Sequence, residues 1–347
     1  MSEALVRFVG VRKWFPVTKG LIANLLDRGG KENVRAVDGI TFEIRRGEVF
    51  GLAGESGSGK STVGRLAIRL LDVTDGQVLF DGQDLGAMSR EELRQTRRRM
   101  QVIFQDPLAS LNPRMTIGQA IEHPALIHLP DLSAQERTQR VLNLLDDVGM
   151  SPPELYYGKY PHQISGGQRQ RIVIARALIT APELIVADEP IAMADVSVRA
   201  VLLDLMMKLK EEFDLTYLFI THDLATAKYV CDRIAIMYLG EIIEIGTLTE
   251  IYEHPQHPYT RALLDAVPVP DPLHRRLEPL PPGEIPNPIN PPPGCRFHPR
   301  CPIAVEGVCN VDAPQLIQVV GDSDDHLAAC HLRTGVHQDL DPERVPG

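Results

Sequence analysis

The chain has 347 residues, of which 44% are hydrophobic and 24% charged, ordinary usage for a globular protein with one large or two modest domains. Its net charge of −10 argues against a general nucleic-acid binder, and no apolar run reaches the roughly 18 residues needed to span a bilayer. The N-terminus lacks the basic stretch and apolar core of a secretory signal, so we expect a cytoplasmic protein.

Strands and helices alternate along the first 266 residues. We expect strands at 5–11, 40–44, 49–53, 184–187 and 216–220, and helices at 60–71, 90–99, 133–148, 168–180 and 198–213. The short apolar runs at 49–53 and 184–187 are typical of strands that are buried on both faces. This order predicts an α/β fold with a mostly parallel sheet covered by helices.

The composition changes near residue 267. Prolines crowd residues 267–294, where they exclude regular helix and predict an extended linker. A cysteine-bearing segment and a polar tail follow at 295–347. We therefore expect a main domain at 1–266, a linker, and a small C-terminal segment.

Residues 54–62 read Gly-Glu-Ser-Gly-Ser-Gly-Lys-Ser-Thr and match the phosphate-binding loop G-x-x-x-x-G-K-[ST]. The loop stands between an expected strand and an expected helix, where glycines let backbone N–H groups turn towards phosphates and the helix dipole attracts them. A chance Gly- and Ser-rich loop would not need both flanking elements. Lys60 should reach the β- and γ-phosphates of ATP, and the Ser61 hydroxyl should hold Mg²⁺. The predicted phosphate-loop contacts are Gly54, Ser56, Gly57, Ser58, Gly59, Lys60, Ser61 and Thr62.

A phosphate loop alone is compatible with several protein classes, which include GTPases, kinases, helicases and other ATPases. A pair of acidic residues narrows the choice of class. The apolar run at 184–187 ends in Asp188 and Glu189. Asp188 is placed to hold Mg²⁺, and Glu189 to polarise the attacking water as a general base. The alternative, two solvated acids at a strand end, loses weight because the phosphate loop precedes them.

Residues 165–168, Ser-Gly-Gly-Gln, resemble the signature motif of the ABC ATPase family. In that family two nucleotide-binding domains pack head to tail, and the signature of one closes on the γ-phosphate held by the other. The resemblance implies that Ser165, Gly166, Gly167 and Gln168 contact a second subunit's ATP. It also implies the family fold, in which a P-loop ATPase core with a mostly parallel sheet carries an antiparallel β subdomain and a helical signature subdomain.

Three further side chains take their roles from the same resemblance. Gln105 looks like the glutamine that senses Mg²⁺ and the attacking water. His222 looks like the switch histidine that contacts the γ-phosphate, although an isolated histidine after a strand is more often structural. Phe15 stands where the family places an aromatic ring on adenine, with a core aromatic as the alternative.

Residues 192–195 depart from the family, because Ala-Met-Ala-Asp replaces the usual Ser-Ala-Leu-Asp. In the family that loop normally makes contacts across the dimer, so the substitution could alter the coupling between the two ATP sites. The phosphate loop, acids, signature and histidine are all present, and we expect an active ATPase.

Residues 253–261, Glu-His-Pro-Gln-His-Pro-Tyr-Thr-Arg, resemble the His-Pro-Tyr-Thr element of oligopeptide and dipeptide permease ATPases. The resemblance implies an importer with a second ATPase subunit (homologous or identical), two transmembrane permease subunits and an extracytoplasmic binding protein, and a peripheral place on the cytoplasmic face of the membrane. Given the acidic chain, we expect no nucleic-acid partner. Members of the group also carry oligosaccharides. The alternative class is a soluble ABC ATPase acting on nucleic acid or ribosomes, which usually carries two phosphate loops in one chain.

Four of the five cysteines lie in the C-terminal segment: Cys295, Cys301, Cys309 and Cys330. Four thiolates can bind a [4Fe–4S] cluster or zinc, and zinc sites often show C-x-x-C pairs that are missing here. Similar peptide-permease ATPases carry an iron–sulfur cluster on these cysteines, so we expect a structural [4Fe–4S] cluster, with zinc or no metal as alternatives. Because the linker should carry the chain off the ATPase core, we expect this cluster to lie well away from the ATP site.

Two other features are interpreted as structural. Cys231 lies in an apolar stretch that we expect to be helical, where it acts as a small buried hydrophobe. Four arginines between residues 94 and 99 form a basic stretch. The acidic chain and the lack of interleaved aromatic residues favour a solvated helix face over a nucleic-acid patch.

Overall fold

The computed structural model describes residues 3–17, 32–267, 284–334, 337 and 340. Its strands form two sheets, a four-stranded sheet in the order β2-β1-β4-β5 and an eight-stranded sheet in the order β11-β12-β10-β9-β3-β8-β7-β6. The strands are β1 (Ala4–Pro16), β2 (Asn33–Arg45), β3 (Val49–Ala53), β4 (Asp75–Phe80), β5 (Gln83–Asp84), β6 (Met100–Ile103), β7 (Leu184–Asp188), β8 (Thr216–Thr221), β9 (Arg233–Tyr238), β10 (Glu241–Thr247), β11 (Ile317–Gln318) and β12 (Leu327–Ala328).

The sheets confirm the predicted fold class. Strands β9, β3, β8, β7 and β6 pair in parallel, and every residue of β3, β8 and β9 is buried, as their apolar sequences predict. The four-stranded sheet pairs antiparallel throughout. Strands β1 and β2 are 13 residues long each, which is longer than predicted. The two strands pair with each other along their length, and this pairing is not visible in the local sequence pattern of either strand.

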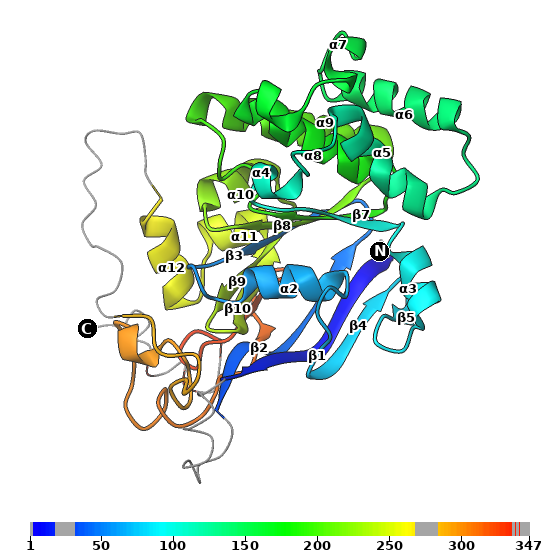
Figure 1. The fold of residues 1–347 in the computed structure, drawn as a ribbon. Helices are drawn as coiled ribbons and strands as arrows, with labels where there is room; N and C mark the ends of the chain where they lie inside the picture. The colour runs from blue at the N-terminus through cyan, green and yellow to red at the C-terminus, as the bar shows by residue number, and fades with distance from the viewer. Residues whose placement is uncertain (1–2, 18–31, 268–283, 335–336, 338–339, 341–347) are drawn as a thin grey trace, which may run out of the picture.

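Several helices pack against one another in one part of the molecule (Figure 1). They form a helical subdomain above the sheets: α4 (Pro107–Ser110), α5 (Ile117–His128), α6 (Ala134–Asp147), α7 (Glu154–Tyr157) and α8 (Gly166–Leu178). The other helices are α2 (Lys60–Ala67), α3 (Arg90–Thr96), α9 (Val196–Phe213), α10 (Leu224–Val230), α11 (Leu248–Glu253) and α12 (Pro258–Asp265), with short 3₁₀ turns η1 (Pro161–Gln163) and η2 (His298–Arg300). In the part of the chain that the structure describes, no helix is both long and apolar enough to cross a membrane.

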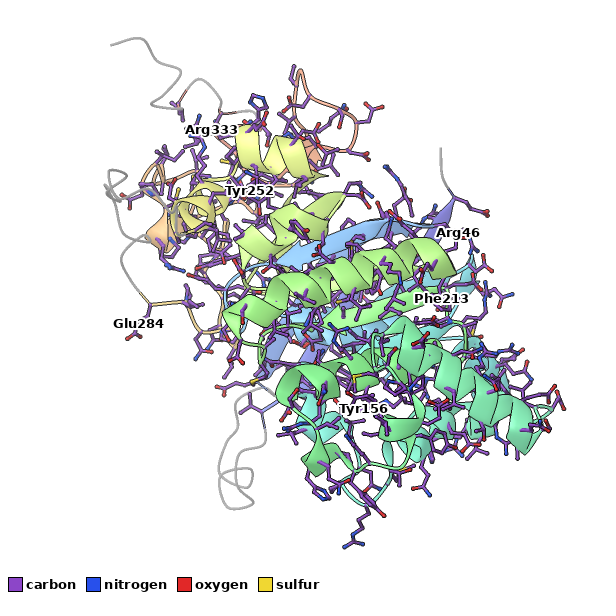
Figure 2. The ribbon with its side chains drawn as sticks, turned by 90° about the horizontal axis from the view of Figure 1, so that it is seen from above. Arg46, Tyr156, Phe213, Tyr252, Glu284 and Arg333 are labelled. Atoms are coloured by element: carbon purple, nitrogen blue, oxygen red, sulfur yellow. The ribbon has the colours of Figure 1, made fainter. Side chains whose placement is uncertain are left out.

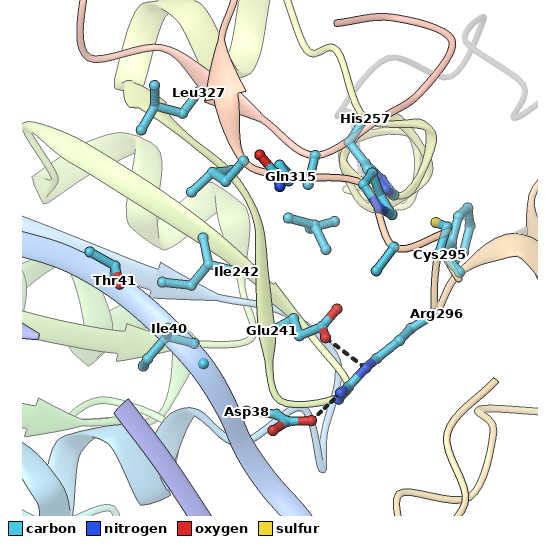
Figure 3. Close-up of a pocket in the computed structure, with 17 residues that line it drawn as sticks. Asp38, Ile40, Thr41, Glu241, Ile242, His257, Cys295, Arg296, Gln315 and Leu327 are labelled. Atoms are coloured by element: carbon cyan, nitrogen blue, oxygen red, sulfur yellow. Dashed lines mark hydrogen bonds and ion pairs between the residues drawn. The ribbon is translucent and has the colours of Figure 1, made fainter. Parts of the chain in front are cut away.

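The C-terminal segment packs on the core, which corrects the expectation that the linker carries it away. Strand β12 pairs with β10, where Ala328 faces Glu244, and so extends the main sheet. Phe297 is 1% exposed within the main core. Arg296 bonds Glu241 (Nε–Oε1 2.9 Å) and Asp38 beside a cavity of about 410 Å³ (Figure 3). These contacts join residues far apart in the sequence, which is why composition alone did not predict them. Most of the proline-rich stretch, residues 268–283, lies outside the described residues.

Seen from above in Figure 2, Tyr156 of the helical subdomain and Arg333 of the C-terminal segment lie on opposite sides of the molecule. The segment therefore belongs to the end of the protein that carries β10 and α12, remote from α5–α8.

The basic stretch at 94–99 is more than a solvated helix face. Arg94 pairs with Glu91 within α3, while Arg99 donates to Asp81 (Nη2–Oδ2 2.6 Å) and Glu183 (Nη2–Oε2 2.9 Å). These arginines bind the chain's own acids and tie the β4–β5 turn to the start of β7.

Cys231 is buried, as predicted, but it follows the last residue of α10 instead of lying within the helix. Its Sγ faces Gly51 of β3, where an added Cβ would come within 2.8 Å of the sulfur. The thiol therefore packs directly against the backbone of β3, at a point where only a glycine leaves room for it.

Candidate nucleotide site

The phosphate loop joins the buried strand β3 to helix α2, which begins at Lys60. Gly54 and Gly59 have φ of 149° and 108°, in the region that favours glycine. A Cβ on Gly54 would approach the Met237 carbonyl oxygen to 2.2 Å, and one on Gly59 would approach that of Ala36 to 2.1 Å. The glycines are thus required by the neighbouring backbone as well as by the turn.

Lys60 lies buried within the loop. Its Nζ donates to the carbonyl oxygens of Gly54 (2.7 Å) and Glu55 (2.8 Å) and to Ser58 Oγ (3.3 Å). Burial lowers the Lys60 pKa, against the opposing effect of nearby carboxylates that include Asp188 and Glu189. The ammonium is therefore held at the centre of the loop, where the phosphates of a nucleotide would lie.

Ser61 and Asp188 come together as predicted for a magnesium site. The Ser61 hydroxyl donates to Asp188 Oδ1 at 3.0 Å, and burial raises the Asp188 pKa. A hydroxyl and a carboxylate side by side are the oxygen ligands that Mg²⁺ prefers next to substrate phosphates, so these two residues fit the ion.

Glu189 accepts from two of the predicted site residues. Gln105 Nε2 donates to Glu189 Oε2 at 2.7 Å, and His222 Nδ1 lies 3.0 Å from Glu189 Oε1. Glu189 has φ of 48°, rare for a non-glycine residue, and its N–H donates to the Ile220 carbonyl at 3.0 Å. The ends of β7 and β8 and the loop after β6 therefore meet at one carboxylate, that of Glu189.

A cavity of about 480 Å³ joins these groups. Its lining is Val34, Ala36, Ser56, Gly57, Gly59, Lys60, Ser61, Thr62, Gln105, Glu189, His222 and Pro288. Gly54 and Ser58 support the loop without lining the cavity. Val34, Ala36 and Pro288 were missed by the sequence reasoning, because they belong to no motif and reach the site only through the fold.

Phe15 is not part of this lining. It pairs with Val34 across the β1–β2 ladder, and the Lys13 ammonium lies 5.1 Å from its ring centroid. Its partner on the ladder thus lines the cavity while the ring does not, and adenine stacking by Phe15 stays a prediction.

Comparisons with known proteins agree with this geometry. The ABC transporter family matches residues 37–192, and the C-terminal region of oligopeptide/dipeptide transporters matches residues 243–309. The chain is 46% identical to the oligopeptide transport ATP-binding protein AppF of Bacillus subtilis (strain 168), over 95% of this chain and 98% of AppF. It is 44% identical to the dipeptide transport ATP-binding protein DppF of Haemophilus influenzae, over 95% of this chain and 97% of DppF.

The chain belongs to the ABC transporter family. Among solved structures, it is similar to the ATP-binding cassette MJ0796 in a dimeric post-hydrolysis state bound to ADP and Pi, with a TM-score of 0.60 and 30% identity over 70% of this chain and 98% of that one. The site is accordingly that of an ABC ATPase, with ATP as its nucleotide.

The ABC signature lies outside the cavity. Ser165 caps α8 in a reciprocal pair with Gln168, since Ser165 Oγ accepts from Gln168 N (3.3 Å) and Gln168 Oε1 accepts from Ser165 N (2.9 Å). Ser165 and Gly166 are exposed, with Gly167 and Gln168 half-buried. The N-terminus of α8 is therefore exposed, and it does not line the cavity beside this chain's own phosphate loop.

The divergent loop of this ABC ATPase is also on the surface. Met193 is 65% exposed, and Asp195 precedes α9 without a capping bond from its side chain. Met193 and Asp195 of this loop are therefore exposed on the surface.

The four C-terminal cysteines converge. The Cys295 N–H donates to the Cys309 carbonyl at 2.9 Å, and every pair among the four thiols is close enough to interact electrostatically. Burial, with a smaller contribution from the neighbouring thiols, raises the pKa of Cys295 and of Cys301 to about 12. Across the described residues, however, no three His, Cys, Asp or Glu side chains are arranged to hold a metal ion.

Proposed function

We propose that the chain hydrolyses ATP to power an importer of oligopeptides or dipeptides. The observation that carries the proposal is the oligopeptide/dipeptide transporter C-terminal region at 243–309, which comes in addition to the ATPase core. Relatives that cover nearly the whole chain are named for transport of these peptides, which favours them over the oligosaccharide alternative.

The proposed mechanism uses the groups around Glu189. Lys60 and the loop amides bind the β- and γ-phosphates, and Ser61 with Asp188 would hold Mg²⁺, which neutralises charge on the phosphate oxygens when bound. Glu189 accepts the proton of the attacking water. Gln105 and His222 contact its two carboxylate oxygens, at 2.7 and 3.0 Å, and so fix the orientation of the base.

We further propose that two such subunits pair head to tail, each signature completing the other's site. The exposed N-terminus of α8 and the exposed loop at Met193 support this arrangement. Two transmembrane permease subunits and an extracytoplasmic binding protein would complete the importer, with this chain peripheral on the cytoplasmic face. The lack of a membrane-crossing helix among the described residues is consistent with that place. Phe15 would stack on adenine beside Val34.

Transport is tested with the chain reconstituted in proteoliposomes together with its permease subunits. Peptide-loaded binding protein is expected to raise ATP hydrolysis several-fold and to drive peptide uptake, because cargo delivery closes the ATPase dimer. The same binding protein loaded with an oligosaccharide should do neither. Stimulation by oligosaccharide alone would overturn the peptide assignment, and stimulation by RNA or ribosomes without permease would favour the soluble alternative.

We also propose that Cys295, Cys301, Cys309 and Cys330 hold one [4Fe–4S] cluster with a structural role. The mutual approach of all four thiols supports it. The wide spacing of the four cysteines in the sequence, without the C-x-x-C pairs that zinc sites often show, favours the cluster over zinc.

Protein purified without oxygen is expected to be brown and to contain about four irons per chain. Cys301→Ser should lose the colour and most of the iron, because one ligand is removed, whereas Cys231→Ala, which changes the remote fifth cysteine, should keep both. One zinc per chain without visible absorbance would show that the site binds zinc and not a cluster. Protein that contains no metal would exclude both assignments.

A further inference from the structure

We propose that Arg300 is a positioning residue for ATP binding, which acts from the C-terminal segment on Glu55 of the phosphate loop. Arg300 ends the short turn η2, directly before Cys301. It is separated from Glu55 by 245 residues, and no nucleotide-binding motif includes it.

The contact is a two-pronged ion pair. Arg300 Nη1 donates to Glu55 Oε2 at 2.9 Å and Nη2 donates to Oε1 at 3.2 Å, the parallel geometry in which a guanidinium grips a carboxylate best. The two side chains are only 5% and 17% exposed, so water screens the pair weakly.

Glu55 is also held through its backbone. Its N–H donates to the Tyr259 hydroxyl at 2.9 Å, and its carbonyl accepts from Lys60 Nζ at 2.8 Å. A shift of Glu55 would therefore displace a partner of the lysine that binds the phosphates.

Arg300 itself stands on a rigid base of aromatic rings. Tyr238, Tyr259 and Phe297 lie with centroids 4.7 to 5.4 Å apart, and each is at most 1% exposed. They come from β9, α12 and the C-terminal segment, and the Arg300 guanidinium lies over two of them at 5.9 and 6.0 Å. Because close-packed cores resist small displacements, this platform fixes the direction in which Arg300 points.

The charge of Glu55 makes the pair matter for ATP. An unpaired carboxylate beside the loop would repel the triphosphate, and Arg300 cancels that charge. At an effective dielectric constant of about 20, one uncompensated charge about 12 Å from an anion changes the affinity for that anion by about tenfold. Arg300 thus contributes the electrical neutrality of the loop's second residue, whose backbone is held in place by Tyr259 and Lys60.

The test compares steady-state kinetics of the full chain with those of matched variants. Arg300→Met is expected to raise the KM for ATP by about tenfold while kcat changes less than about threefold, because Glu189 and its partners are untouched. Arg300→Lys, which keeps the charge but not the fork, should recover part of the loss. Arg7→Met removes an arginine from an exposed pair with Glu43 and should leave KM unchanged.

Glu55→Gln separates charge from general damage. The single variant removes the repelling acid and should not raise KM, and Glu55→Gln combined with Arg300→Met should regain most of the affinity that Arg300→Met loses. The proposal would be overturned if the double variant had a KM for ATP as high as that of Arg300→Met. It would also be overturned if Arg300→Met left the KM unchanged. If Arg300→Met does not fold, a rise in KM for Glu55→Gln alone would overturn it equally.

Discussion

Replacing Glu189 by glutamine is expected to lower ATP turnover by about 10²–10⁴-fold, the usual loss when a general base is removed. The amide keeps the shape of the carboxylate and can stay between Gln105 and His222, but it does not accept a proton from water. ATP binding should persist, because Lys60 and the loop amides are unchanged. Single-turnover phosphate release and nucleotide binding, measured on the same preparation, check both statements.

The same variant should accumulate as an ATP-bound dimer. With hydrolysis blocked, the exposed signature at Ser165 of one subunit stays closed on the nucleotide of the other, and size-exclusion chromatography in Mg²⁺-ATP should show a doubled mass. Glu211→Gln, on the exposed face of α9, is the matched control and should behave as wild type. Turnover near wild type in Glu189→Gln would remove Glu189 from the role of base.

Replacing Glu244 by alanine is expected to cost about 3–5 kcal/mol of unfolding free energy, as when one partner of a buried charged pair is removed. Glu244 is fully buried and accepts from the N–H groups of Gln256 (2.7 Å) and His257 (2.9 Å) and from His326 Nε2 (3.0 Å). Its loss leaves three donors without an acceptor at the junction of β10, the loop before α12 and the C-terminal segment. Urea unfolding measures the change, and a loss below about 1 kcal/mol would contradict it.

The pH dependence of stability gives a second check on this junction. Burial alone would lower the His326 pKa, but hydrogen bonds to Glu244 and Asp322 raise it above its ordinary value. A raised pKa means that the folded state holds the proton more tightly, so this stabilisation is complete below about pH 6.5 and is lost as the pH rises through the folded pKa. The wild type should lose stability over that upper range, and His326→Gln should lack this part of the pH dependence.

The local motifs of the site were predictable because their chemistry is written in short, contiguous stretches. The glycines and Lys60 of residues 54–62 act through their own backbone turn, and Asp188 with Glu189 follows an apolar strand. Strands β3, β7 and β8 were predicted within one residue of their ends, since burial on both faces leaves a continuous apolar run. Where the resemblance placed Gln105 and His222, the structure brings both to Glu189.

Helix ends and long ladders were less predictable. Helix α2 ends at Ala67 instead of running to residue 71, because Arg69 adopts a positive φ of 50°. Residues 68–71 contain no glycine or asparagine that would have predicted such a conformation. Strands β1 and β2 exceed their predicted lengths, because antiparallel pairing with a distant partner stabilises residues that show no alternation of their own.

The sequence by itself predicted the chemistry of this protein: a phosphate loop, a general base, a magnesium pair and, through the resemblance to ABC ATPases, a signature that closes on a second subunit's ATP. Only the tertiary structure decided where the C-terminal segment goes. Its prolines predicted departure from the core, yet β12 joins β10 and Arg300 reaches Glu55. The physical reason is that a local sequence pattern indicates only the backbone conformation of a short stretch. The contact between His326 and Glu244 joins residues more than 80 positions apart, and that between Arg300 and Glu55 joins residues more than 240 positions apart, so both depend on the packing of the whole core.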